Sequence, residues 1–314
     1  MPDVVFRTEQ LTKRYGPLVA VQDLSLQVYE GEVLGLLGPN GAGKTTSINM
    51  MCGLLKPDSG QVLIHGQPIR SHDTGTRTKV GVCPQNTVLW NNLTCLEQLE
   101  FIGEMYDMPR KVAHQRGEAL LDIMGLADKR NQLARTLSGG MQRRLNLIMA
   151  LVHDPDILVL DEPEAGLDPQ SRVLVREYIK SLARKKTVIL TTHNMDEADR
   201  IADRIAIMDH GQLLRLDTPE ALKRSVGEGD VLEVEVAGGQ DYLIERAVAA
   251  IAQIAPDVSA TGHTLVIRAR GVVELLSALL EALRKVGLPP GEVRLRENTL
   301  EDVFITLTGR RLRE

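Results

Sequence analysis

The stretch Gly38–Thr45 is the part of this sequence whose residue types and spacing most clearly imply chemistry. It reads Gly-Pro-Asn-Gly-Ala-Gly-Lys-Thr and matches GxxxxGK[ST] at every fixed position. Glycines let backbone N–H groups turn inward around phosphate oxygens, and the lysine adds a positive charge for the β- and γ-phosphates. The threonine supplies a hydroxyl for Mg²⁺. The pattern predicts a nucleotide site formed by Gly38, Pro39, Asn40, Gly41, Ala42, Gly43, Lys44, Thr45 and Thr46.

The flanking residues provide the context that a phosphate loop needs. The apolar run Val33–Leu37 precedes the loop and predicts a buried strand, and Thr45–Leu55 predicts a helix after it. The N-terminal end of such a helix is positive and would point at the same oxygens. A glycine-rich turn that matched the pattern by chance would not be expected to have a strand before it and a helix after it. The two flanking elements therefore argue against a chance match.

Two adjacent acids, Asp161 and Glu162, directly follow the apolar run Ile157–Leu160. Ligands of open α/β sheets bind outside the carboxyl ends of the strands, so both acids should approach the phosphate loop. We expect Asp161 to hold Mg²⁺ through its water shell and Glu162 to polarise the attacking water as general base. A plain acidic turn accounts well for one acid but less well for two beside a phosphate loop.

His193 ends a third predicted strand, which begins at Val188–Leu190. It could donate a hydrogen bond to the γ-phosphate or orient the attacking water. Taken alone, it could equally be a surface or core histidine without a catalytic role.

Short apolar runs alternate with helical patterns over the first two thirds of the chain, which predicts an α/β domain. Val5–Glu30 reads as short strands with turns and predicts an antiparallel edge sheet. From about residue 86 to 153 the pattern is mostly helical and predicts a helical subdomain. The helices expected there are Cys95–Tyr106, Arg116–Met124 and Met141–Val152.

A second domain is expected after the linker Ser225–Gly229. Strands and helices alternate again there, which predicts a small α+β domain over residues 230–314 behind a nucleotide domain over residues 1–224. The expected strands are Val231–Val236, Thr264–Ala269 and Glu292–Leu295, and the expected helices are Tyr242–Ile254, Val272–Val286 and Leu300–Leu307, the last one capped by Asn298 or Thr299.

Composition limits the protein class. The 314 residues carry a formal net charge of −5, which argues weakly against a nucleic-acid partner. No run of about 18 apolar residues is present, and the N-terminus lacks a signal-peptide pattern. The three cysteines Cys52, Cys83 and Cys95 have no metal-ligand spacing, so we expect reduced, buried thiols.

Leu137-Ser138-Gly139-Gly140-Met141 precedes the acid pair and opens a predicted helix. A serine cap and two glycines at a helix start form a second anion site. The segment resembles the signature sequence of ABC ATPases, which are P-loop NTPases. The resemblance implies ATP and Mg²⁺ as ligands, and a head-to-tail dimer in which each signature closes over the ATP of the other copy.

The other motifs of the ABC family follow in order over about residues 4–220. Tyr15 resembles the aromatic that stacks on adenine, and Gln85 resembles the glutamine that senses Mg²⁺ and water. Gly166, Leu167 and Asp168 resemble the D-loop, and His193 resembles the switch histidine. The resemblance implies a catalytic set of Lys44, Gln85, Glu162 and His193, and a metal set of Thr45, Gln85 and Asp161.

The segment from Asn298 to Arg310 resembles the tail of daunorubicin-resistance-type exporter ATPases. Members of that branch export drugs, lipids or polysaccharides through a separate membrane permease, which implies a position at the cytoplasmic face of the membrane. The permease contact is expected around Asn86–Phe101. Leu89 and Trp90 there are candidates for an apolar contact or for local core.

One position departs from the family pattern, because Glu164 stands where Thr or Ser is common. We expect it to reach solvent without effect; the alternative is that it perturbs the ionisation of Glu162. Three other functions remain possible: an importer-type ATPase, a soluble ABC ATPase with a mechanical role, and a nucleotide-dependent binding module without useful turnover.

Overall fold

The computed structural model describes residues 3–69, 78–227, 230–236, 241–269 and 271–309. The chain divides into two compact units, Met1–Pro219 and Glu220–Leu312. Of the sequence features discussed above, Glu228 and Gly229 of the linker and Arg310 of the tail lie outside the described residues.

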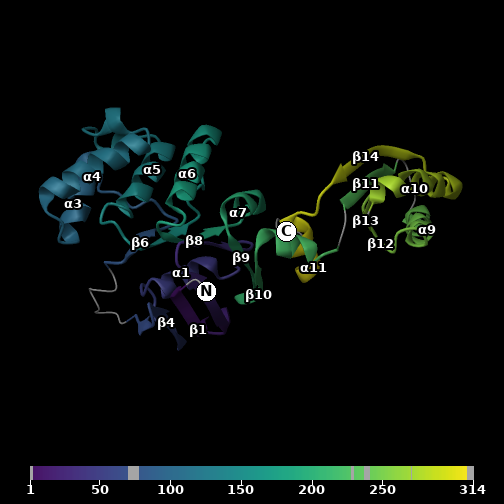
Figure 1. The fold of residues 1–314 in the computed structure, drawn as a ribbon, viewed down its shortest axis with the longest axis horizontal. Helices are drawn as coiled ribbons and strands as arrows, with labels where there is room; N and C mark the ends of the chain where they lie inside the picture. The colour runs from purple at the N-terminus through teal and green to yellow at the C-terminus, as the bar shows by residue number, and fades with distance from the viewer. Residues whose placement is uncertain (1–2, 70–77, 228–229, 237–240, 270, 310–314) are drawn as a thin grey trace. The chain divides into compact units, whose positions relative to one another are not determined.

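The first unit is built on a six-stranded sheet in the order β10-β9-β3-β8-β7-β6 (Figure 1). All neighbouring pairs are parallel except β9 and β10. The strands are β3 (Val33–Leu37), β6 (Val80–Cys83), β7 (Ile157–Asp161), β8 (Thr187–Thr192), β9 (Arg204–Asp209) and β10 (Gln212–Asp217). The strands expected at Val33–Leu37, Ile157–Leu160 and Val188–Leu190 are confirmed as β3, β7 and β8; β9 and β10 had not been recognised.

Alternate residues of the central strands enter two different cores, as the two-residue period of a strand requires. Leu158 and Leu160 face the core that holds the helices, whereas Ile157 and Val159 face the core shared with the second sheet. The strands are therefore buried on both faces, which explains their continuous apolar runs.

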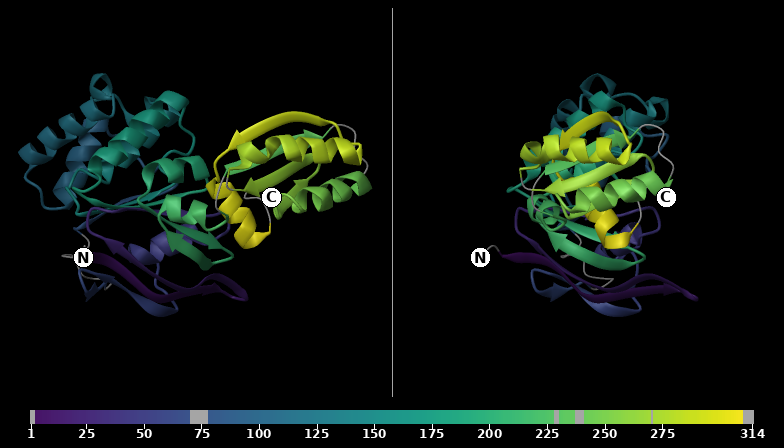
Figure 2. Two further views of the ribbon diagram at one scale, coloured as in Figure 1. Left: turned by 45° about the vertical axis from the view of Figure 1, so that its right-hand side comes forward. Right: turned by 90° about the vertical axis from the view of Figure 1, so that its right-hand side faces the viewer.

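An antiparallel sheet in the order β2-β1-β4-β5 covers one side, with helix α1 (Lys44–Met51) in the core between the two sheets (Figure 2). Its strands are β1 (Val4–Tyr15), β2 (Leu18–Tyr29), β4 (Ser59–Ile64) and β5 (Gln67–Pro68). The expected edge sheet is confirmed, although its first two strands are each 12 residues long rather than several short ones.

Helices pack on the other face of the central sheet. They are α3 (Cys95–Met105), α4 (Arg110–Ile123), α5 (Gly139–Met149), α6 (Pro169–Leu182) and α7 (Met195–Ile201), with 3₁₀ turns at Ala127–Lys129 and Ala134–Thr136. Helix α4 begins six residues before the expected start, and Pro109 precedes it as N-cap residue. The α3 start is fixed by a capping box between Thr94 and Glu97.

The second unit contains a four-stranded antiparallel sheet in the order β12-β13-β11-β14. Helices α9 and α10 share a hydrophobic core with this sheet. The elements are α8 (Pro219–Arg224), β11 (Asp230–Val236), α9 (Asp241–Ala252), β12 (Asp257–Thr261), β13 (Thr264–Ala269), α10 (Val272–Val286), β14 (Pro290–Arg296) and α11 (Leu300–Thr308). The sequence pattern had not revealed α8 and β12, and Thr299, not Asn298, caps α11.

Candidate active site

Strand order brings the sequence motifs together. The phosphate loop follows β3, His193 follows β8, the acid pair ends β7 and Gln85 follows β6. These four strands are consecutive neighbours in the sheet, and all run parallel. Their carboxyl ends therefore meet along one edge, where an open α/β sheet binds ligands.

The phosphate loop depends on glycines for its path. Gly43 has φ +93°, and a Cβ at this position would lie 2.4 Å from the carbonyl oxygen of Ala20 in β2. A Cβ at Gly38 would lie 2.3 Å from the carbonyl oxygen of Met208 in β9. Any larger residue at either position would push the loop away from the neighbouring strand, so Gly38 and Gly43 are sterically required.

Lys44 lies at the centre of this edge. Its Nζ donates hydrogen bonds to the carbonyl oxygens of Gly38 at 2.7 Å and Pro39 at 3.0 Å, and it lies 3.9 Å from Oε1 of Glu162. Burial lowers the pKa of the ammonium, while the carboxylates of Glu162 and Asp161 act in the opposite direction. The lysine is thus held at the loop, where bound phosphates would meet its charge.

The acid pair is fixed by β8. The hydroxyl of Thr191 donates to Asp161, and the N–H of Glu162 donates to the hydroxyl of Thr191 at 2.9 Å. Glu162 has φ +49°, a left-handed backbone that is uncommon for residues other than glycine. The turn redirects the chain at the strand end, directly after Asp161.

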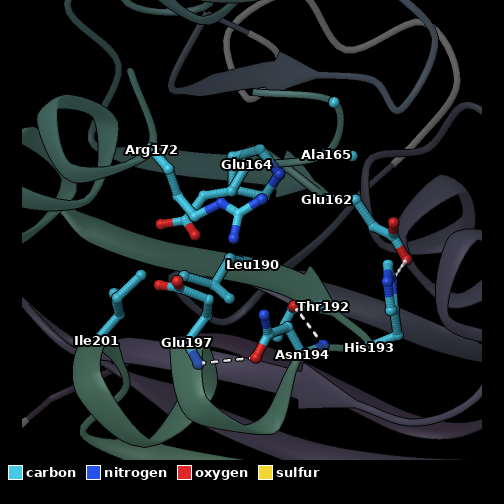
Figure 3. A pocket seen from close by; sticks show the side chains of 12 residues that line it. Glu162, Glu164, Ala165, Arg172, Leu190, Thr192, His193, Asn194, Glu197 and Ile201 are labelled. Carbon is cyan, nitrogen blue, oxygen red and sulfur yellow. Dashed lines mark hydrogen bonds and ion pairs between the residues drawn. The ribbon is translucent and has the colours of Figure 1, made fainter. Parts of the chain in front are cut away.

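Glu162 and His193 form a pair. Nδ1 of His193 lies 2.9 Å from Oε1 of Glu162, and a dashed line marks this contact in Figure 3. Glu162 is buried, whereas the His193 side chain is 53% exposed. The imidazole thus has one side on the carboxylate and the other open to solvent, and the pair can orient a water molecule and exchange a proton with it.

Arg143 of α5 connects the helix that follows the signature segment to two loops, the one after β6 and the one after β7. Its Nη1 donates to the carbonyl oxygens of Pro84 and Gln85, and its Nη2 donates to those of Asp161 and Glu162, each at 2.7 Å. The side chain is buried. The sequence analysis did not identify this residue. Its position on the apolar side of a helix is the feature that could have predicted its burial.

The D-loop lies against the signature segment of the same chain. Asp168 caps α6 by accepting from the N–H groups of Gln170 and Ser171. A Cβ on Gly140 would lie 3.6 Å from Oδ2 of Asp168. Ser138 caps α5, with its hydroxyl accepting from the N–H of Met141 at 3.3 Å, and a Cβ on Gly139 would meet open space. The start of α5 is therefore accessible to a ligand, as the predicted second anion site requires.

The structure gives less support to two predicted residues. Tyr15 is half-exposed, and its ring lies 5.8 Å from Nζ of Lys13. Gln85 is exposed and is held through its backbone carbonyl by Arg143. Their proposed contacts with adenine and with the metal ion stay predictions.

The expectation for Glu164 is wrong. Its side chain is 11% exposed and lies 3.8 Å from Nε of Arg176, inside the chain rather than in solvent. Burial raises the pKa of Glu164 to about 8, with a further contribution from neighbouring Glu197. Glu164 follows the turn at Glu162, which points it back between α6 and α7; sequence spacing alone did not show this.

Mg²⁺ fits this set of donors. Asp161 offers a carboxylate and Thr45, exposed at the start of α1, offers a hydroxyl, which are the oxygen ligands that Mg²⁺ takes alongside phosphates. Across the described parts of the chain, no group of three or more His, Cys, Asp or Glu side chains could hold a metal by itself. The ion would depend on the nucleotide for its remaining ligands.

Comparison with known proteins agrees with this geometry. Residues 21–165 match the ABC transporter family. The Nod factor export ATP-binding protein I of Ralstonia nicotianae is 39% identical over 312 residues, covering 99% of this chain and 95% of the relative. The chain belongs to the ABC transporter family. Like other ABC ATPases, it binds ATP and hydrolyses it for transport.

Other relatives extend the similarity over the whole chain. The linearmycin resistance ATP-binding protein LnrL of Bacillus subtilis is 35% identical, covering 99% of this chain and all of the relative. The daunorubicin resistance ATP-binding protein DrrA3 of Streptomyces coeruleorubidus is 36% identical and covers 100% and 99%. Both relatives match the first and the second unit of this ABC ATPase.

Solved structures of ABC cassettes share the fold. The cassette MJ0796, described as a dimer in a post-hydrolysis state bound to ADP and Pi, superposes with a TM-score of 0.63 at 28% identity, over 68% of this chain and 98% of that one. An ATP-binding subunit of an ABC transporter gives 0.66 at 26% identity, over 70% and 92%. Within the described residues, no helix is long and apolar enough to cross a membrane.

Proposed function

We propose that this ABC ATPase drives export through a separate permease, at the cytoplasmic face of a membrane. Support comes from the relatives, whose names describe Nod factor export, linearmycin resistance and daunorubicin resistance. The chain resembles them over nearly its full length, including the second unit. The identity of the exported molecule is decided by the permease, because the substrate does not pass through this chain.

In this proposal ATP closes a head-to-tail dimer. Ser138, Gly139 and Gly140 at the start of α5 bind the ATP held by the phosphate loop of the other copy. The open space at Gly139 and the dimer described for MJ0796 support this arrangement. The second unit, over about residues 230–314, contributes to the dimer or to its regulation.

The proposed mechanism assigns one task to each residue. Lys44 and the phosphate-loop N–H groups bind the phosphates and stabilise charge that develops on them. Glu162 accepts a proton from the attacking water, and His193 holds that water and the γ-phosphate in place. Thr45, Gln85 and Asp161 would hold Mg²⁺, which neutralises charge on the phosphates. The 2.9 Å contact between Glu162 and His193 is the observation that carries these roles.

The permease contact is proposed on the surface around α3. Trp90 and Phe101 are exposed and pack edge to face, with ring centroids 5.0 Å apart. Val88 and Met105 are also exposed, whereas Leu89 packs against the core of the unit. Of the two candidates from the sequence, the geometry therefore favours Trp90 as the contact and Leu89 as local core.

Substitution of the catalytic base tests the assignment. A Glu162→Gln variant should bind ATP, accumulate as a closed dimer and lose about 10²- to 10⁴-fold in kcat, the usual contribution of a general base. Glu177→Gln is the matched control, because Glu177 is an exposed acid on α6. Dimer formation is measured by size-exclusion chromatography with ATP, and turnover by phosphate release. Wild-type turnover in Glu162→Gln would refute the role of Glu162.

A further inference from the structure

A cavity of about 190 Å³ lies beside the Glu162–His193 pair (Figure 3). It is enclosed by the turn after β7, by α6 and by α7. Glu164, Arg172 and Glu197 give it charged walls, and Leu190 and Ile201 give it apolar ones. The expected family motifs assign no role to these charged residues.

Arg176 of α6 joins two of the surrounding segments through a buried ion pair. Its Nε donates to Oε2 of Glu197 at 2.7 Å, and its Nη2 donates to Oε1 at 2.6 Å. Such a bidentate contact fixes both distance and orientation. Arg176, Glu197 and Glu164 are each only 11% exposed, so the contact is shielded from solvent.

Glu164 gives this cluster one carboxyl group more than the arginine can satisfy. Neither of its oxygens has a hydrogen-bond donor among the described residues, and Nε of Arg176 is 3.8 Å away. A carboxyl group without a donor is costly to bury in its charged form. With a proton, however, Glu164 becomes able to donate, and the carboxylate of its neighbour Glu197 is able to accept.

The charged groups around Glu164 come from every surrounding element. Arg172 and Arg176 face it from α6 and Glu197 faces it from α7, while Glu162 and His193 line the same cavity. The pKa of Glu164 is raised to about 8, chiefly by burial and also by Glu197, whereas Arg176 and Arg172 act to lower it. Burial and the charge of Glu197 therefore both favour the protonated form of Glu164.

The cluster connects the three segments that carry catalytic motifs. The carbonyl oxygen of Glu164 accepts from the N–H of Leu167 in the D-loop, and Glu162 lies two residues before it. Glu197 lies in the first turn of α7, where Asn194 accepts from its N–H, and His193 is the residue before Asn194. A displacement of Glu164 relative to Glu197 would therefore shift the D-loop relative to His193.

We propose that Glu164, Arg176 and Glu197 are positioning residues that hold the D-loop and the His193 segment in register for hydrolysis, through a bridge that requires a proton on Glu164. Loss of this proton places a second carboxylate beside that of Glu197, whose partner Arg176 already makes two hydrogen bonds to it, and the repulsion between the carboxylates separates the turn from α7. Hydrolysis should then slow as the solution becomes alkaline. This inference rests on the roles proposed above for Glu162 and His193.

A comparison of pH profiles tests the bridge. Glutamine at position 164 keeps a donor for Glu197 but cannot ionise. The ratio of kcat in Glu164→Gln to kcat in the wild type should rise about tenfold between about pH 7 and about pH 9. One pH unit above its pKa, a carboxyl group has about ten deprotonated molecules for each protonated one, so only about a tenth of the wild-type protein would keep the bridge. Glu177→Gln should follow the wild-type profile throughout, because its side chain is outside the cavity.

A second variant separates positioning from simple packing. Glu164→Ala removes the donor, so its kcat should be several-fold below that of Glu164→Gln at neutral pH, with little change in the KM for ATP. A constant Glu164→Gln to wild-type ratio, or equal kcat values for the Ala and Gln variants, would overturn the bridge. If Glu164→Ala does not fold, the pH dependence of the Glu164→Gln to wild-type kcat ratio still tests the bridge.

The same assays distinguish this inference from the proposed function. Full turnover in Glu162→Gln would refute the catalytic assignment on which the bridge depends. An inactive Glu162→Gln together with a constant Glu164→Gln ratio would refute only the bridge.

Discussion

Replacement of Arg143 by methionine should destabilise the nucleotide unit more than replacement of its neighbour Arg144. Methionine retains much of the length of the side chain but donates no hydrogen bonds. Two of the four carbonyl groups that Arg143 serves, those of Asp161 and Glu162, belong to buried residues, whereas Gln85 is exposed and can recover water. The two buried carbonyl groups therefore determine how much the free energy of unfolding falls.

The loss should be about 2 to 6 kcal/mol, because each buried acceptor left without a donor costs about 1 to 3 kcal/mol. For a unit of this size, that lowers Tm by about 5 to 15 °C. Arg144→Met is the matched control: Nη1 of Arg144 donates to a single carbonyl oxygen, that of buried Met124, so its replacement should cost about 1 to 3 kcal/mol, half the loss expected for Arg143→Met. Arg143→Lys keeps the charge but loses the planar fork, so its stability should fall between the wild type and Arg143→Met.

Trp90 allows the measurement to be made on this unit alone. It is the one tryptophan of the chain, it lies in the first unit, and its backbone N–H group donates to Gln98. Urea and thermal unfolding followed by tryptophan fluorescence therefore report the nucleotide unit. If Arg143→Met were no less stable than Arg144→Met, the four short hydrogen bonds would not hold the two loops, and the reasoning would be wrong.

Three further changes have defined outcomes. Gly43→Ala should abolish ATP binding in a fluorescent-nucleotide titration, because its Cβ would lie 2.4 Å from the carbonyl oxygen of Ala20. Glu164→Gln should raise the stability of the nucleotide unit in urea unfolding, and the gain should grow as pH rises from about 4.5 to about 8: over that range the folded group must hold a proton that the unfolded group has released. Asp302→Asn should destabilise the second unit in calorimetry by about 3 kcal/mol, since the buried Asp302 carboxylate accepts from Arg296 and Arg268. Burial alone would raise the pKa of Asp302, but hydrogen bonds from Arg296 and Thr299 hold it well below its usual range, so the wild-type stability should be lost only as pH falls below about 4.

The motifs that act through local chain geometry could be predicted from the sequence. A strand, a glycine loop and a helix start are contiguous between Val33 and Met51, so residue spacing alone defines the phosphate loop. The same holds for the cap at Ser138 and for the acids at the end of β7. The unbroken apolar runs of the central strands also predicted that these strands are buried.

Contacts between distant segments were decided by the tertiary structure. The 3.9 Å contact of Lys44 with Glu162 and the 2.9 Å contact of Glu162 with His193 depend on the order β3-β8-β7 in the sheet, which the succession of strands along the chain does not specify. Arg143 and Glu164 show the same limit. Each is a charged residue, and each is buried because segments between 12 and 59 residues away supply its partners or its cover. The free energy of a charge depends on what surrounds it in space, and only the folded chain sets those surroundings.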